Sequence, residues 1–200
     1  LYRTQIIKYL CNNTFLKKYI YISTPEVFGS SKKFISEKNG MFDPSTPYAT
    51  SKLSTEMLLK NYSRHYNLPL IITRFSNFYG PGQPLYRLIP KIISCIDKHK
   101  KFPLQGSGKS KRNFIFSKDF CNGIYKALKK GKIGQIYHFS GKTFYSVLEI
   151  VKLICDLKSY KISKLLSKSK ERVGQDTIYK LQSSFTIKSL LWKPVYSLKK

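Results

Sequence analysis

Acidic residues are scarce in this 200-residue chain, which has 10 Asp and Glu against 37 Lys and Arg and a formal net charge of +27. Such an imbalance is typical of proteins that bind nucleic acids or membrane surfaces. The lysines, however, are spread along the whole chain, and they accompany an excess of Ile, Asn, Phe and Tyr, the mixture that an AT-rich coding sequence produces. We therefore do not expect nucleic acid as a partner, although a basic surface would attract a diphosphate.

Long hydrophobic runs and targeting signals are also missing. No uninterrupted apolar stretch approaches the ~18 residues of a membrane-spanning helix. Residues 1–16 lack the pattern of a signal peptide and instead predict an amphipathic helix. We therefore expect a globular cytoplasmic protein without a membrane partner.

Cysteine and histidine are few, with 4 and 3 residues. The cysteines are scattered, with no C-x-x-C pair and no histidine at metal-ligand spacing. This pattern is typical of free thiols in a reducing compartment, and it predicts no metal site.

What the sequence does contain is a regular alternation of short apolar runs and longer amphipathic segments. This alternation predicts an α/β fold in which a parallel sheet is flanked by helices. We expect strands at 18–23, 70–75, 112–116 and 134–139, and helices at 2–16, 47–66, 85–99, 118–130, 145–157 and 184–190. The lysine- and serine-rich residues 158–170 predict a mobile surface segment.

The stretch S-T-P-Y-A-T-S-K, residues 45–52, opens the longest predicted helix, because Ser or Thr suits an N-cap and Pro the first turn. Tyr48 and Lys52 lie four residues apart and therefore on one helical face. An ammonium group beside a phenol lowers a phenol pKa that starts near ~10. Tyr48 is thus a candidate general acid/base, although a Tyr–Lys pair at this spacing also occurs on ordinary helix surfaces.

Two polar loops directly follow predicted strands, S-T-P-E-V-F-G at 23–29 and S-N-F-Y-G-P-G-Q at 76–83. Open α/β sheets bind ligands at the carboxyl ends of their strands. The two loops therefore belong to the same candidate site as the start of the 47–66 helix.

The motifs S-T-P-E-V-F-G, P-Y-A-T-S-K and R-F-S-N-F-Y-G-P-G-Q, in this order and spacing, resemble the NAD-dependent epimerase/dehydratase family, extended short-chain dehydrogenase/reductases that act on nucleotide sugars. Residues 105–119, 137–141 and 172–176 are similar to its later motifs, and the 4,6-dehydratase branch is the most similar. The resemblance implies that residues 1–84 are the carboxyl-side part of a Rossmann-type NAD-binding domain. Residues 85–200 would form mainly a smaller substrate-binding lobe, with some segments returning to the Rossmann sheet.

The resemblance also implies catalytic and cofactor-binding roles. Tyr48 would be the acid/base at the sugar 4-hydroxyl, and Thr24 would hydrogen-bond the same hydroxyl. Glu26 would act as a base at the sugar. Lys52 would bind the nicotinamide ribose of NAD and lower the Tyr48 pKa, and Ser23 would also contact the cofactor.

For the substrate, the resemblance implies that Asn77 contacts the nucleotide sugar and that Arg112 and Arg172 hold its diphosphate. Guanidinium groups suit this task because they bind phosphate oxygens in a bidentate way. A homodimer is also implied for the full-length enzyme.

Two features depart from the family pattern. The chain opens with Leu and contains no G-x-x-G-x-x-G phosphate-binding loop, so we expect either a longer enzyme with about a hundred further amino-terminal residues or an inactive remnant. Pro25 stands where the dehydratase branch has an Asp that protonates the leaving 6-hydroxyl. A nucleotide-sugar 4-epimerase or a UDP-glucuronate decarboxylase are therefore alternatives, and a basic nucleic-acid-binding module is the alternative from another class.

Overall fold

The computed structural model describes residues 2–12, 15–170, 174 and 176–198. The helices are α1 (Tyr2–Cys11), α2 (Pro47–Tyr66), α3 (Leu88–Asp97), α4 (Ser117–Lys130), α5 (Val147–Leu157), α6 (Ile162–Leu165) and α7 (Ser184–Leu190), with a 3-10 helix η1 (Pro25–Phe28). The strands are β1 (Tyr19–Ser23), β2 (Phe34–Ile35), β3 (Leu70–Phe75), β4 (Asn77–Tyr79), β5 (Phe102–Gln105), β6 (Lys111–Phe116), β7 (Ile136–Phe139), β8 (Phe144–Ser146), β9 (Leu166–Ser169) and β10 (Lys180–Leu181).

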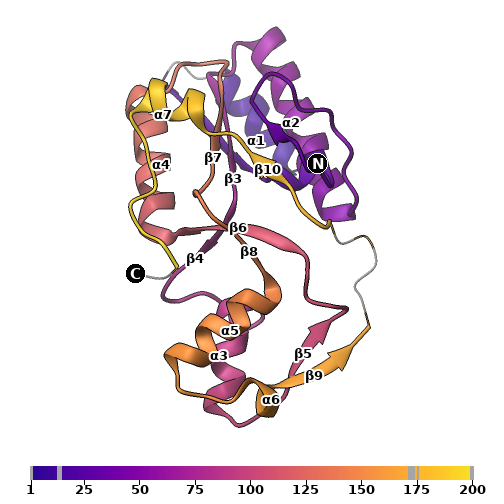
Figure 1. Cartoon of the computed structure of the whole chain (residues 1–200). Coiled ribbons are helices and arrows are strands. Elements are labelled where there is room, and N and C mark those ends of the chain that lie inside the picture. Colours follow the sequence, from indigo (N-terminus) through magenta and orange to yellow (C-terminus); the bar gives the residue numbers. More distant parts are fainter. Residues whose placement is uncertain (1, 13–14, 171–173, 175, 199–200) are drawn as a thin grey trace.

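The upper lobe in Figure 1 is built on a parallel sheet with strand order β1-β3-β7. Every residue of the central strand β3 is buried, which explains why its sequence is a continuous apolar run interrupted only by Thr73 and Arg74. Helices α1 and α2 cover one face of the sheet, and α4 and α7 cover the other. The predicted α/β fold with a parallel sheet between helices is therefore confirmed.

The lower lobe contains α3, α5, α6 and the parallel pair β5–β9 (Figure 1). A small sheet of order β4-β6-β8 lies between the lobes. The lower lobe has its own apolar core, in which Ile92 and Ile96 of α3 pack against Ile150 and Ile154 of α5. The chain crosses between the lobes several times, and near its end β10 pairs with β2 of the upper lobe.

Local sequence signals account for the helix that carries Tyr48. The Thr46 side chain accepts a hydrogen bond from the Ala49 N–H at 3.2 Å, and Pro47 occupies the first helical position. Asn67 ends α2 in the left-handed conformation, with φ of 54°. The start of α2 is thus fixed by residues close to it in the chain.

Several predicted elements are wrong in their extent or nature. The helix predicted at 2–16 ends at Cys11, and residues 13–14 lie outside the described part. The expected loop after β3 contains strand β4, which pairs with β6. Residues 158–170, predicted to be mobile, form α6 and β9 instead, because Leu165 is fully buried in the lower core.

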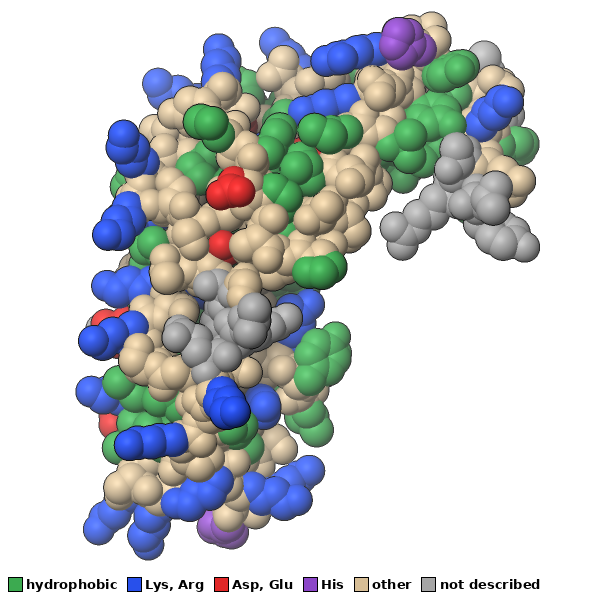
Figure 2. All heavy atoms as spheres, turned by 90° about the vertical axis from the view of Figure 1, so that its right-hand side faces the viewer, with side chains coloured by type: hydrophobic (Ala, Val, Ile, Leu, Met, Phe, Trp, Pro, Cys, Tyr) green, Lys and Arg blue, Asp and Glu red, His purple; other side chains and the backbone are tan. Residues whose placement is uncertain are grey.

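Basic side chains are spread over both lobes. Figure 2 shows Lys and Arg on the face turned to the viewer, with few acidic groups, and an outline that is concave between the lobes. Among the described helices, none is both long enough and apolar enough to cross a membrane.

Candidate functional site

The start of α2 places Tyr48 and Lys52 beside the carboxyl end of β1. Lys52 Nζ donates a hydrogen bond to the Ile22 carbonyl at 2.9 Å, and it lies 5.1 Å from the centre of the Tyr21 ring. Tyr48, in contrast, is 53% exposed. The ammonium group is therefore held at the strand end, and the phenol is open to solvent.

The electrostatic surroundings of Tyr48 differ from the prediction. Partial burial raises the pKa of Tyr48, the Glu26 carboxylate raises it further, and Arg87 opposes them. The expected lowering by Lys52 is thus wrong for this structure. The effect of Glu26 on Tyr48 agrees with the fold, because η1, which carries Glu26, is in contact with α2.

The end of β1 and the loop after it are buried at Ser23, Thr24 and Pro25. Thr24 is buried, and its side chain accepts a hydrogen bond from the Glu26 N–H at 3.3 Å as the N-cap of η1. Pro25 follows as the first residue of η1 and is buried as well. Ser23 is 5% exposed, and its Oγ is the one buried side-chain polar atom of the described residues without a hydrogen-bond partner.

On the substrate side, the predicted residues Asn77 and Arg112 are joined by a residue that sequence analysis missed, Tyr179. The Tyr179 hydroxyl donates to Asn77 Oδ1 at 2.9 Å, and the Arg112 guanidinium carbon lies 4.8 Å from the centre of the Tyr179 ring. Burial raises the pKa of Tyr179, and the charges that act on it include Arg112, Glu26 and Tyr48. Tyr179 thus lies between the two halves of the candidate site.

A bridging segment, residues 176–181, connects the loop after η1, the start of α2 and strand β6. Asp176 Oδ1 accepts hydrogen bonds from Ser30 Oγ at 3.2 Å and from Ser45 Oγ at 3.0 Å, directly before α2. Arg112 Nη2 donates to the Asp176 carbonyl at 2.6 Å. Arg112 is therefore bonded to the bridging segment in this structure, and the predicted Arg172 lies outside the described residues.

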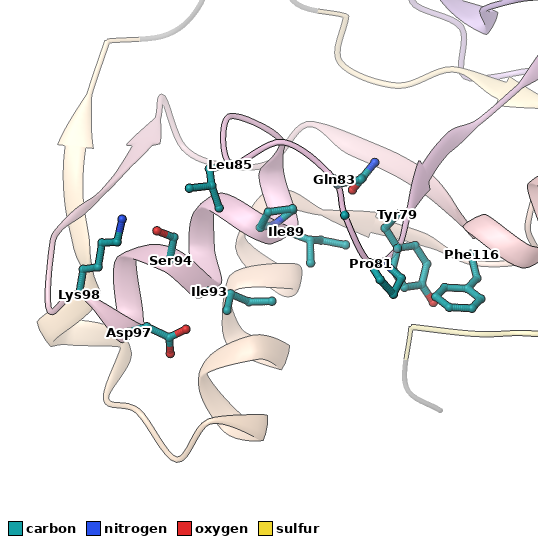
Figure 3. A pocket seen from close by; sticks show the side chains of 13 residues that line it. Tyr79, Pro81, Gln83, Leu85, Ile89, Ile93, Ser94, Asp97, Lys98 and Phe116 are labelled. Atoms are coloured by element: carbon teal, nitrogen blue, oxygen red, sulfur yellow. The ribbon is translucent and has the colours of Figure 1, made fainter.

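Two cavities do not include Tyr48, Lys52, Thr24 or Glu26, although the first is lined by Tyr79 and Gln83 of the predicted 76–83 loop. One of about 560 Å³ opens between α3 and the loop after β4, and its walls are mostly apolar (Figure 3). Tyr79 and Phe116 form one end of it, and Asp97 and Lys98 lie at the other. A second, of about 270 Å³, is lined by Glu37, Gln135 and Phe185 among others. We therefore locate the candidate site by its side chains.

Metal ligands are not gathered in any part of the chain that the structure describes: no group of three His, Cys, Asp or Glu residues could hold an ion there. The groups around Tyr48 can exchange protons, since α2 with its phenol contacts η1 with the Glu26 carboxylate.

The model of the NAD dependent epimerase/dehydratase family matches residues 2–139. The chain is 32% identical over 198 residues to dTDP-D-glucose 4,6-dehydratase of Homo sapiens, which covers 96% of this chain and 56% of that protein. It is 34% identical over 192 residues to dTDP-glucose 4,6-dehydratase of Haemophilus influenzae, covering 88% and 56%. The chain thus spans little more than half the length of these curated relatives.

Solved structures give the same result. A dTDP-glucose 4,6-dehydratase from Streptomyces venezuelae with NAD bound superposes with a TM-score of 0.92 at 29% identity, covering 96% of this chain and 59% of that one. UDP-glucuronic acid 4-epimerase from Bacillus cereus, in complex with UDP-glucuronic acid and NAD, gives 0.91 at 26% identity, covering 98% and 62%. Because the family match includes more than half of the chain and agrees with both relatives and fold, the chain belongs to the NAD dependent epimerase/dehydratase family.

Proposed function

We propose that the protein carrying this chain modifies nucleotide sugars through transient oxidation of the sugar C4 with NAD, in the manner of a dTDP-glucose 4,6-dehydratase. One observation carries the proposal: α2, which carries Tyr48, contacts η1, which carries Glu26, and the Glu26 carboxylate raises the pKa of Tyr48. The hydrogen bond from Tyr179 to Asn77 supports a substrate-binding role for the neighbouring strand β4.

The residues at the end of β1 fit the nicotinamide-ribose part of NAD. Ser23 offers a buried hydroxyl without a partner, and Lys52 and Tyr48 provide hydrogen-bond donors beside it. NAD, when bound, supplies a hydride acceptor. The sequence contains no glycine-rich loop of the kind that binds the diphosphate of a dinucleotide.

In this proposal Tyr48, ionised to the phenolate, takes the proton of the 4-hydroxyl at Oη while Thr24 orients that hydroxyl. Glu26 removes a further proton from the sugar. The raised pKa of Tyr48 means that the phenol is protonated at neutral pH in this structure. A cation close to Tyr48 Oη lowers the pKa, and Arg87 already acts in that direction.

A second candidate follows from Pro25. This buried proline has no proton to give to a leaving 6-hydroxyl, so a 4-epimerase or a decarboxylase, which release no water, suit the site equally well. The likeness to the UDP-glucuronic acid 4-epimerase from Bacillus cereus supports this alternative.

We also propose that residues 1–84 belong to the NAD-binding domain and residues 85–200 mainly to the substrate-binding lobe. The exposed Met57 and Leu58 on α2 support a homodimer, since dimers bury such apolar surface. The four cysteines are free, which supports a cytoplasmic location.

The full-length protein should be incubated with NAD and, separately, dTDP-glucose, UDP-glucose and UDP-glucuronate, and the products identified by mass spectrometry and NMR. Loss of one water supports the dehydratase, an epimer of unchanged mass the epimerase, and loss of carbon dioxide the decarboxylase. Tyr48→Phe is the matched inactive control, with an expected loss of about a hundred-fold or more. If no sugar is converted by the unmodified protein, the proposed function is wrong.

A further inference from the structure

A buried ion pair lies directly behind the candidate site. Arg74 of β3 donates from Nε to Glu56 Oε1 at 2.9 Å and from Nη2 to Glu56 Oε2 at 2.5 Å. The two side chains are 1% and 0% exposed. The bidentate geometry fixes the guanidinium plane relative to α2, which carries Glu56.

His138 of β7 completes the hydrogen bonding of this guanidinium. Arg74 Nη1 lies 3.1 Å from His138 Nε2, and because an arginine only donates, Nε2 must be the acceptor. The proton is therefore on Nδ1, which lies 3.3 Å from the Ile35 carbonyl. Burial and the Arg74 charge lower the pKa of His138 to about 3, so the imidazole stays neutral.

Two phenylalanine rings close the cluster. The guanidinium carbon of Arg74 lies 4.8 Å from the centre of the Phe28 ring and 5.4 Å from that of Phe42. Phe28 is the last residue of η1, the element that also carries Glu26. Arg74 therefore contacts η1 through a ring face and α2 through a carboxylate.

The contacts of Arg74 thus reach every element on which the proposed proton-transfer groups stand. Glu56 follows Lys52 by four residues and lies on the same face of α2. Ser23, at the end of β1, pairs in register with Arg74. A displacement of the guanidinium would move α2 and η1 relative to each other.

Stability alone gives no reason for this cluster. The desolvation free energy of two buried charges offsets much of their Coulomb attraction. Apolar residues of similar volume therefore often stabilise a protein equally well or better. What apolar residues cannot provide is the fixed direction of a bidentate pair.

We propose that Arg74, together with Glu56 and His138, is a positioning group that sets α2 against η1 and so holds Tyr48 at its working distance from Glu26. The expected effect of Arg74 on turnover rests on the proposed function, whereas its effect on the position of Tyr48 can be tested without it.

The test compares Arg74→Met, Glu56→Leu and the double variant R74M/E56L in the full-length protein. Each single variant leaves one buried charge unpaired and should unfold at clearly lower urea concentration, and the double variant should recover most of the loss. We expect kcat in the double variant to stay at least about ten-fold low with KM changed less than about three-fold, because Asn77 and Arg112 are not on α2. The matched control is D97N/K158M, which removes the exposed ion pair between α3 and the end of α5 and should change neither parameter.

The second readout is the ionisation of Tyr48, followed by NMR of ¹³C-labelled tyrosine and assigned with Tyr48→Phe. In R74M/E56L, the pKa of Tyr48 should fall, because a phenol that moves away from η1 is less buried and lies farther from the Glu26 carboxylate. If the double variant fails to fold, Arg74→Lys keeps the charge but not the bidentate pair, and the same shift is expected. If the folded variants have the same kcat and the same Tyr48 pKa as the parent protein, the proposal is wrong. If the parent protein shows no turnover, the proposed function fails, and the Tyr48 pKa still decides the positioning role.

Discussion

Acid should destabilise this protein through His138 in a calculable way. Its pKa is about 3 in the folded protein and ~6.5 in an unfolded chain, so the unfolded state binds a proton more readily. For a group whose folded pKa is depressed, stability is complete above the unfolded pKa and is lost as pH falls toward the folded one. The loss from His138 therefore begins near pH 6.5 and continues to about pH 3.

The size of the effect follows from the same two pKa values. Between pH 7.5 and pH 5 the free energy of unfolding should fall by about 2 kcal/mol through His138 alone, and by about 4 kcal/mol on reaching pH 3. Because the imidazole is fully buried, solvent does not screen this penalty.

The comparison protein is His138→Gln, whose amide oxygen can accept from Arg74 but which does not titrate. Urea unfolding of both proteins at pH 7.5 and pH 5 should show the parent losing about 2 kcal/mol more than the variant. The Glu37 carboxyl, whose pKa burial raises, acts in the opposite direction in both proteins and cancels in the difference. His65→Gln, at the exposed end of α2, should behave like the parent. An equal loss in the parent and His138→Gln would refute the reasoning.

Three further predictions concern the backbone, the cofactor and the charge. Gly29→Ala should lower the free energy of unfolding by more than about 2 kcal/mol, because φ at Gly29 is +62° and a Cβ would clash with the Asp43 carbonyl oxygen. Gly82→Ala, where φ is +77° but the space is open, should lower it by only about 1 kcal/mol. Similar urea midpoints for the two variants would contradict this prediction. Lys52→Ala should weaken NAD binding in the full-length protein, because the Lys52 ammonium group is held at the carboxyl end of β1, and an unchanged NAD affinity would show that Lys52 does not bind the cofactor. Filter binding of DNA and RNA should be weak with little salt dependence, since the basic side chains are scattered; micromolar affinity that falls steeply with salt would favour the nucleic-acid-binding alternative.

Elements with strong local signals could be predicted from the sequence, and those made by distant partners could not. Helix α2 is predicted by its own N-cap residue and proline, and β3 is predicted by its apolar run. Strand β4 exists only because β6, which starts 32 residues after β4 ends, pairs with it. The residues of α6 and β9 look polar on average, yet Leu165 is buried in the lower core, Ile162 and Leu166 pack against that core, and β9 pairs with β5.

The candidate site shows the same division. Tyr48, Thr24 and Glu26 lie in two short motifs, and the structure brings those motifs face to face, although their roles stay predictions. Tyr179 has no local signal that separates it from the other tyrosines, and it meets Asn77 across 102 residues of chain. The Tyr48 pKa was predicted in the wrong direction because helical spacing reveals Lys52 but neither the burial of the phenol nor the nearby carboxylate.

The pairing of β2 with β10 has a consequence for how the chain folds. Phe34 and Lys180 are 146 positions apart (180 minus 34), so closing this loop costs about 4 kcal/mol of chain entropy before any contact compensates for it. During synthesis Ile35 therefore cannot pack against Leu181, a member of the same apolar cluster, until residue 181 has left the ribosome. Until then the apolar side chains around η1 remain uncovered, and the nascent upper lobe is a natural substrate for chaperones.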